Sequence, residues 1–109
     1  MAPKSKSEAV KTAHDKAYQY MQEINSCAWC TMRALQDTFD MQDDNMLKAA
    51  GAITGGIGGM ADTCGSLISG ALMLGAVCGA GRNDGDRTIG PGKRVLPLVQ
   101  AKKRQYYLQ

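Results

Sequence analysis

The sequence is poor in aromatic residues and in histidine. Its 109 residues include one Phe, one Trp and one His, against 13 Gly, seven Met and four Cys. A core filled mainly by bulky rings is therefore excluded, and the many small residues indicate helices that approach one another closely. The length is that of a single domain.

Residue patterns of the common enzyme classes are also missing. With His14 as its one histidine, the chain offers no Ser-His-Asp grouping. The segment GGIGGM (residues 55–60) lacks the Lys-Ser/Thr ending of a phosphate loop, and GAITGG (51–56) follows no predicted strand, which excludes a dinucleotide fold. These absences favour an electron carrier or an accessory subunit over a stand-alone enzyme.

Signals for export, nucleic-acid binding and membrane insertion are weak or absent. No apolar run follows the basic N-terminal residues, so we expect no signal peptide and a cytoplasmic protein. Basic ends around an acidic middle, without interleaved aromatic residues, are typical of solvated tails and not of a nucleic-acid surface. Residues 63–81 are uncharged, but Gly, Ser and Thr dilute them and Asp62 precedes them, which favours a buried helix over a membrane span.

Apolar residues spaced by three and four predict an all-α fold. Ser5 and Glu8 have the spacing of a capping box, and Asn25 and Ser26 favour the start of a second helix. The predicted helices cover residues 8–23, 27–39, 45–53 and 64–78, with a last one from Pro97. We expect a small bundle of four to five helices with a glycine-rich, closely packed core. This cysteine-bearing domain would span residues 1–81, and residues 82–109 would form a Gly-rich loop and a basic C-terminal tail.

Small residues recur at four-residue spacing in the fourth predicted helix. Gly65 pairs in this way with Ser69, and Ser66 pairs with Gly70. This spacing places small side chains on one helix face, where a second backbone can come close. We therefore expect this helix to pack tightly in the core.

The four cysteines are the strongest chemical signal. In a reducing compartment they indicate a metal site, a redox role or simple burial. Cys27 and Cys30 form a CxxC pair, whose sulfurs face the same way on a helix and could share a metal ion or a disulfide. Cys27 and Cys64 both follow residues that favour helix starts, where a thiolate is favoured over a thiol. We expect Cys27, Cys30 and Cys64 to form one site, with a fourth ligand position open.

The remaining cysteine and the histidine carry weaker signals. Cys78 lies 14 residues after Cys64, which is about 21 Å along an unbroken helix. It can join the site only if the helix breaks at a glycine or if a second chain supplies it, and burial in a packed helix is the favoured interpretation. His14, beside Asp15, is not favoured as a ligand.

Two segments carry a resemblance to a known family: NSCAWCTMRALQDTF (25–39) and AAGAITGGIGGMADTCGSLISGALMLG (49–75). They resemble the small redox-active proteins named for a Cys-Gly-Ala-x-x-Gly signature, and the helical iron-sulfur module of split-Soret cytochrome c. Cys27 matches the early cysteine of that family, and Cys64-Gly65 matches the start of the signature. The resemblance covers roughly residues 8–81. Ser66 and Ser69 replace the expected Ala and Gly, and no cysteine follows Cys78, where the family has two further ones towards its C-terminus.

The resemblance implies a redox or iron-sulfur role. The leading hypothesis is a small electron-transfer protein whose cysteines hold an iron-sulfur cluster, of the [2Fe–2S] type by family analogy. Its metal ligands would come from Cys27, Cys30, Cys64 and Cys78, and its partner would be a redox protein or a larger oxidoreductase complex. A metal-free alternative is a dithiol that cycles through a Cys27–Cys30 disulfide. A third is a non-redox helical assembly module, either as a homodimer or docked on a larger complex.

Overall fold

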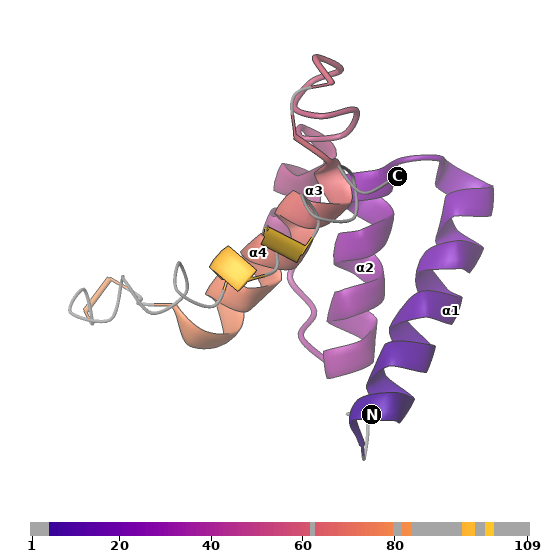
Figure 1. Cartoon of the computed structure of the whole chain (residues 1–109), viewed down its shortest axis with the longest axis vertical. Coiled ribbons are helices and arrows are strands. Elements are labelled where there is room, and N and C mark those ends of the chain that lie inside the picture. The colour runs from indigo at the N-terminus through magenta and orange to yellow at the C-terminus, as the bar shows by residue number, and fades with distance from the viewer. Residues whose placement is uncertain (1–4, 62, 80–81, 84–94, 98–99, 102–109) are drawn as a thin grey trace. The chain divides into compact units, whose positions relative to one another are not determined.

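The structure is a computed structural model that describes residues 5–61, 63–79, 82–83, 95–97 and 100–101. These residues form an all-α fold, as the sequence predicts, and no strand occurs among them. The helices are α1 (Lys6–Ile24), α2 (Cys27–Phe39), α3 (Asp44–Gly51) and α4 (Gly65–Cys78), shown in Figure 1. Residues 95–97 and 100–101 are also helical, so the last helix includes Val95, two residues before the predicted start at Pro97.

The chain divides into two compact units, Met1–Gly70 and Ala71–Gln109, and the division falls within α4. The first unit contains α1, α2, α3 and the start of α4, and it is the one that bears on the candidate site. The predicted division of the chain at residue 81 stays a prediction.

Local capping chemistry sets the helix ends. Ser5 accepts a hydrogen bond from the Glu8 amide (3.2 Å), and Asp43 accepts one from the Met46 amide (3.1 Å), so each satisfies an amide of a first turn. Asn25 and Asp40 adopt left-handed backbone angles directly after α1 and α2, which ends both helices. The chain therefore reverses direction between α1 and α2, and the two helices lie side by side and antiparallel (Figure 1).

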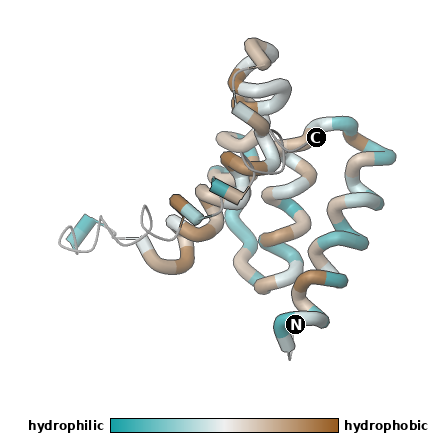
Figure 2. Tube along the Cα trace, viewed as in Figure 1, coloured by the Kyte–Doolittle hydropathy of each residue, from teal (hydrophilic) through white to brown (hydrophobic). Residues whose placement is uncertain are grey.

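Helix α2 is the central element of the first unit. Two sets of its side chains are buried, and the sets point to opposite sides because successive helical residues turn by about 100°. One set is Ala28, Met32 and Gln36, and the other is Cys30, Ala34 and Thr38. In contrast, no residue of α1 is fully buried, and Figure 2 shows α1 as largely hydrophilic. Helix α2 thus provides most of the core, and α1 covers one of its sides.

The core consists of small and flexible side chains, with few bulky ones. In the first unit its buried apolar residues are Ala28, Cys30, Met32, Ala34 and Ala50, and the buried backbone of Gly56 and Gly65 adds to them. Buried polar groups have partners: the Gln36 amide donates to the Asp43 carbonyl (3.0 Å) and Thr38 donates to the Ala34 carbonyl (2.7 Å). Close helix approach and hydrogen bonding thus replace the missing aromatic core.

A cluster of polar and aromatic side chains joins α1 to α2. The Tyr20 hydroxyl donates to Asp37, and the Arg33 guanidinium lies over the rings of Tyr20 (4.3 Å) and Trp29 (5.3 Å). The amide of Gln42 donates a further hydrogen bond to Asp37 (3.0 Å). Tyr20 and Gln42 thus both bond the Asp37 carboxylate, and Arg33 packs on the Tyr20 ring, so these contacts hold α1 against α2.

These contacts shift two pKa values. Partial burial works to raise the pKa of Asp37, but hydrogen bonds from Gln42 and Tyr20 and the charges of Lys16 and Arg33 outweigh it, so the pKa lies below its ordinary value. The hydrogen bond to Asp37, followed by burial, raises the pKa of Tyr20. Asp37 therefore stabilises the fold above the ordinary carboxyl pKa of about 3.9, and this contribution disappears as the pH falls through its folded value. Tyr20 stabilises the fold below about pH 10, and this contribution disappears as the pH rises through its folded value.

The segment between α3 and α4 contains a run of residues with left-handed backbone conformation. Gly55, Gly56, Gly58 and Gly59 have φ values of 72°, 72°, 62° and 85°, and Ile57 between them has φ 72°. Glycine adopts such angles without a steric cost, whereas a β-branched residue is strained there. This stretch ends the third helix at Gly51, earlier than the predicted Ile53, and it returns the chain to α2.

Among the described residues, no helix combines the length and the apolar character needed to cross a bilayer. The predicted burial of residues 64–78 holds for Gly65, Ser69 and Met73, whereas Leu72 and Val77 are exposed.

The α1–α2 cluster predicts a pH-dependent loss of stability when Tyr20 is replaced. Tyr20→Phe removes the hydroxyl donor and is expected to lower the free energy of unfolding at neutral pH by about 1 kcal/mol. The stability lost towards acid and alkaline pH should then be smaller than in the unsubstituted chain. Urea unfolding at about pH 3, 7 and 10.5 measures this, with Tyr18→Phe as the control because Tyr18 is 65% exposed. Equal losses for the two variants would contradict the assignment.

The left-handed segment predicts a stabilising substitution. Ile57→Asn replaces a strained, exposed β-branched residue with one that tolerates positive φ, so the free energy of unfolding should rise by about 0.5–1 kcal/mol. Val10→Asn is the control, because Val10 is also exposed but lies within α1, and it should change stability little. A loss of stability in Ile57→Asn would show that residue 57 is not left-handed.

Candidate functional site

Cys27 is the first residue of α2 and is half-buried. The preceding residue, Ser26, occupies the N-cap position, but its hydroxyl is hydrogen-bonded to the Thr54 hydroxyl and does not cap the helix. The positive end of the α2 dipole is therefore not offset by a side-chain cap at Ser26. A negative charge on a group in this first turn is stabilised by that dipole.

Cys64 lies directly before α4, and its carbonyl accepts the hydrogen bond of the Ile68 amide (3.1 Å). It therefore occupies the N-cap position of α4, which the sequence had assigned to Asp62 or Thr63. Thr63 lies one residue too early to cap the helix, and Asp62 lies outside the described residues. The side chain of Cys64 is exposed.

The starts of α2 and α4 meet at Gly65. A Cβ atom on Gly65 would lie 2.9 Å from Cys27 Sγ, 3.0 Å from the Ile53 carbonyl oxygen and 3.1 Å from Ala28 Cβ. Any side chain at residue 65 would therefore collide with α2 or with the end of the α3 region. Since Cys64 is the neighbour of Gly65 in the chain, the structure brings Cys27 and Cys64 to adjacent helix starts.

Small polar residues hold the two helices together beyond Gly65. Ser69 is completely buried and donates a hydrogen bond to the Ala28 carbonyl (2.7 Å). Thr31 donates to the Ser66 hydroxyl (3.2 Å). The predicted face of small residues on the fourth helix is thus confirmed for Gly65, Ser66 and Ser69, and it packs against α2.

A groove of about 300 Å³ opens beside Cys27. Its wall on one side is α1, and the other side is formed by α2 and the first turn of α4. The side chains that line it are His14, Tyr18, Met21, Cys27, Thr31 and Ser66, together with Ala17. Cys27 is thus a thiol at a helix start that faces a cavity with both apolar and hydrogen-bonding walls.

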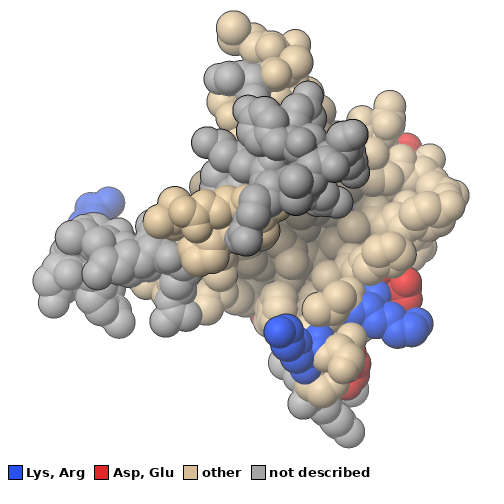
Figure 3. Space-filling model, viewed as in Figure 1, with Lys and Arg blue, Asp and Glu red and all other residues tan. Residues whose placement is uncertain are grey.

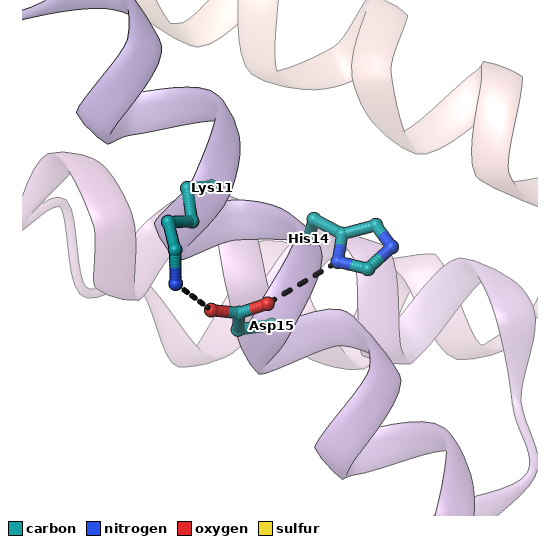
Figure 4. Close-up of polar contacts among 3 residues, drawn as sticks. All are labelled: Lys11, His14 and Asp15. Atoms are coloured by element: carbon teal, nitrogen blue, oxygen red, sulfur yellow. Dashed lines mark hydrogen bonds and ion pairs between the residues drawn. The ribbon is translucent and has the colours of Figure 1, made fainter.

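His14 connects this groove to a charged pair on α1. Its Nδ1 lies 3.3 Å from Asp15 Oδ1, and Lys11 Nζ lies 3.2 Å from Asp15 Oδ2 (Figure 4). The hydrogen bond with His14, followed by the contact with Lys11, holds the pKa of Asp15 below its ordinary value. Basic and acidic side chains both lie along α1 on the face drawn in Figure 3. The histidine that sequence reasoning set aside therefore lies in the same groove as Cys27.

Cys30 differs from Cys27 in burial. It is completely buried and is not among the residues that line the groove, whereas Cys27 is half-buried and lines it. Cys78 ends α4 and donates a hydrogen bond from its sulfur to the Leu74 carbonyl (3.0 Å), a contact within its own helix.

No disulfide joins the four cysteines, all of which the structure describes. Within the described part of the chain, no three His, Cys, Asp or Glu side chains gather in a way that could hold a metal ion. The predicted common site of Cys27, Cys30 and Cys64, and the metal role of Cys78, stay predictions.

Sequence reasoning missed the contribution of α1 to this site. Ala17, Tyr18 and Met21 line the groove, but their spacing in the sequence is that of an ordinary amphipathic helix. Thr31 and Ser66 lie next to the predicted cysteines, but nothing in the sequence indicates that they contact each other. The one sequence feature that could have indicated Thr31 and Ser66 is that both are small polar residues within one helical turn of a predicted site cysteine.

Two alanine substitutions test the contact at Gly65. Gly65→Ala places a methyl group against three atoms at 2.9–3.1 Å and should lower the free energy of unfolding by about 1–3 kcal/mol. Gly75→Ala in the same helix meets no described atom within 4 Å and should raise it by about 0.5–1 kcal/mol, because alanine favours a helix over glycine. Thermal and urea unfolding measure both. Equal effects of the two substitutions would contradict the close approach of α4 to α2.

Comparison with known proteins gives one match. Neither the curated proteins nor the solved structures contain a significant match to this chain. The model of a protein family described as "Putative redox-active protein (C_GCAxxG_C_C)" matches residues 25–107, which is more than half of the chain. The letters of that description place two cysteines after the GCAxxG segment, whereas only Cys78 follows Cys64 here. From this match, the chain belongs to the C_GCAxxG_C_C family, the family that the sequence resembles.

Proposed function

We propose that this protein is a thiol–disulfide redox protein that reacts through Cys27. The observation that supports this most is the position of Cys27 at the first residue of α2, half-buried and facing a groove of about 300 Å³. The groove gives a substrate access to the Cys27 sulfur, and the thiolate is the reacting form of cysteine. Membership of a redox-active family agrees with this chemistry.

The reaction is an exchange of two electrons with a partner that carries a disulfide. The Cys27 thiolate attacks one sulfur of that disulfide, the partner's S–S bond breaks, and the departing sulfur keeps the electron pair and takes a proton. A second thiol of the chain then loses its proton and attacks Cys27 Sγ, so that an internal disulfide forms and the partner's other sulfur leaves. The chain loses two electrons and two protons, and the partner's disulfide becomes two thiols.

The groove suggests which partner fits. Its volume suits a small disulfide or the exposed loop of a protein disulfide, and its walls offer the hydroxyls of Tyr18, Thr31 and Ser66. His14 also lines the groove, and its Nδ1 lies 3.3 Å from Oδ1 of Asp15, a residue that pairs with Lys11. A partner with carboxylate and amide groups around its disulfide would find hydrogen-bonding groups there.

An iron-sulfur cluster, of the [2Fe–2S] type by family analogy, is the second candidate, because the family resemblance favours it. Such a cluster needs several deprotonated cysteines that converge on one point. Cys27 and Cys64 lie at adjacent helix starts, but Cys30 is completely buried, and the described residues contain no group of three ligands. We therefore place the dithiol reaction first.

Thiol counting under defined redox conditions tests the proposal. Incubation without oxygen in mixtures of reduced and oxidised glutathione should lower the count from four thiols to two in the unsubstituted chain. Cys27→Ser should lose this response, because the reacting sulfur is absent. Cys78→Ser is the matched control and should keep it, since Cys78 is bonded within α4.

A parallel spectrum and metal analysis separate the two candidates. Protein prepared without oxygen and treated with iron and sulfide should remain colourless and free of iron. A brown protein that retains iron and acid-labile sulfide, and that gains no thiols on simple reduction, would overturn the dithiol proposal in favour of a cluster.

A further inference from the structure

We propose that Cys64, and not Cys30, is the second thiol of this reaction, which forms the internal disulfide with Cys27. This inference rests on the proposed function. It adds a second reacting residue to the site, and it replaces the Cys27–Cys30 pair that the CxxC spacing indicates.

The contact at Gly65 places the Cys27 sulfur at the start of α4. A Cβ atom on Gly65 would lie only 2.9 Å from Cys27 Sγ, so this sulfur touches the backbone of residue 65. The Cα atoms of Cys64 and Gly65 are one peptide apart, about 3.8 Å. The Cys27 sulfur therefore contacts the backbone of the residue that directly follows Cys64. Disulfides join residues whose Cα atoms lie about 4.4–6.8 Å apart, a range that such neighbours can reach.

The backbone around Cys64 can adapt to a disulfide more readily than the backbone around Cys30. Cys64 is exposed, lies outside the helix and contributes its carbonyl to the first hydrogen bond of α4. Cys30 is completely buried, and its amide is fixed in the helix by a hydrogen bond to the Ser26 carbonyl (2.8 Å).

Helix geometry also disfavours the Cys27–Cys30 pair. Residues three apart on a helix have Cβ atoms about 5–6 Å apart, whereas a disulfide requires about 3.5–4.5 Å. Both cysteines lie in the helical segment of α2, so their disulfide would require the first turn to distort. Cys30 is also completely buried and does not line the groove that Cys27 faces.

The two cysteines then have distinct roles. Cys27 attacks the partner's disulfide from within the groove and forms the mixed disulfide, and the partner's first sulfur leaves as a thiol. The Cys64 thiolate, having lost its proton to water, attacks Cys27 Sγ and forms the Cys27–Cys64 disulfide. The partner's second sulfur leaves with the electron pair and takes up a proton. Cys30 and Cys78 remain thiols throughout.

Oxidised glutathione is the probe that tests these roles, with full-length protein and mapping of disulfides by mass spectrometry of peptides. The unsubstituted chain and Cys30→Ala should both form the Cys27–Cys64 disulfide, because alanine keeps the buried position apolar. Cys64→Ser should stop at a glutathione adduct on Cys27 and should lose the internal disulfide. Circular dichroism of each variant establishes that the helices are retained.

The outcomes distinguish this inference from the proposed function. A Cys27–Cys30 disulfide in the unsubstituted chain, or in Cys64→Ser, would overturn the role of Cys64 and leave Cys27 as the reacting thiol. An adduct that accumulates on Cys64 in Cys27→Ser, with no adduct on Cys27 in Cys64→Ser, would reverse the two roles and also overturn the inference. No reaction of Cys27 in any folded variant would overturn the proposed function itself.

Discussion

The close approach of α4 to α2 at Gly65 is the contact on which the rest of the site depends. Residue 65 has no side chain, so the Cys27 sulfur, the Ile53 carbonyl and the Ala28 side chain can all lie against its backbone. This approach brings Ser69 within hydrogen-bonding distance of the Ala28 carbonyl and Ser66 within reach of Thr31. A chain with few aromatic residues thereby obtains a dense interface from small side chains and hydrogen bonds.

The left-handed stretch at Gly55–Gly59 makes this approach feasible. Four glycines with positive φ reverse the chain within a few residues after α3, and the amides of Ile57, Gly58 and Gly59 bond to carbonyls at Ile53, Ala52 and Thr54. These carbonyls belong to the three residues directly after α3, so the stretch folds back on the segment that leaves this helix. The chain can then enter α4 directly beside α2. Strain at Ile57 accompanies this geometry.

Each cysteine has a different environment, and the differences follow from its place in the helices. Cys27 begins a helix and faces a groove, Cys64 precedes a helix and is exposed, and Cys30 is buried one turn into α2. Cys78 is bonded within the last turn of α4. Thiols of one chain can therefore differ in access and in backbone freedom, which are the properties that determine which of them exchange disulfides.

The sequence by itself determined the elements of this protein. Spacing, caps and glycine positions predicted the four main helices within a few residues, the small-residue face of α4, and the place of Cys27 and Cys64 at helix starts. It also carried the resemblance to the redox-active family to which the chain belongs. These features are local, because they depend on hydrogen bonds and side-chain periods within a few residues.

Only the tertiary structure decided which residues of α2 are covered by its neighbours. The CxxC spacing placed Cys27 and Cys30 together, and they are about 60° apart around the helix. Packing leaves Cys27 half-buried beside the groove, whereas Cys30 is completely buried. In the same way, Ala17, Tyr18 and Met21 became walls of a groove only because α1 lies beside α2. The 3.6-residue repeat of a helix determines which residues share a face. The turns between helices determine which other helix packs against that face, and turns have no such repeat in the sequence.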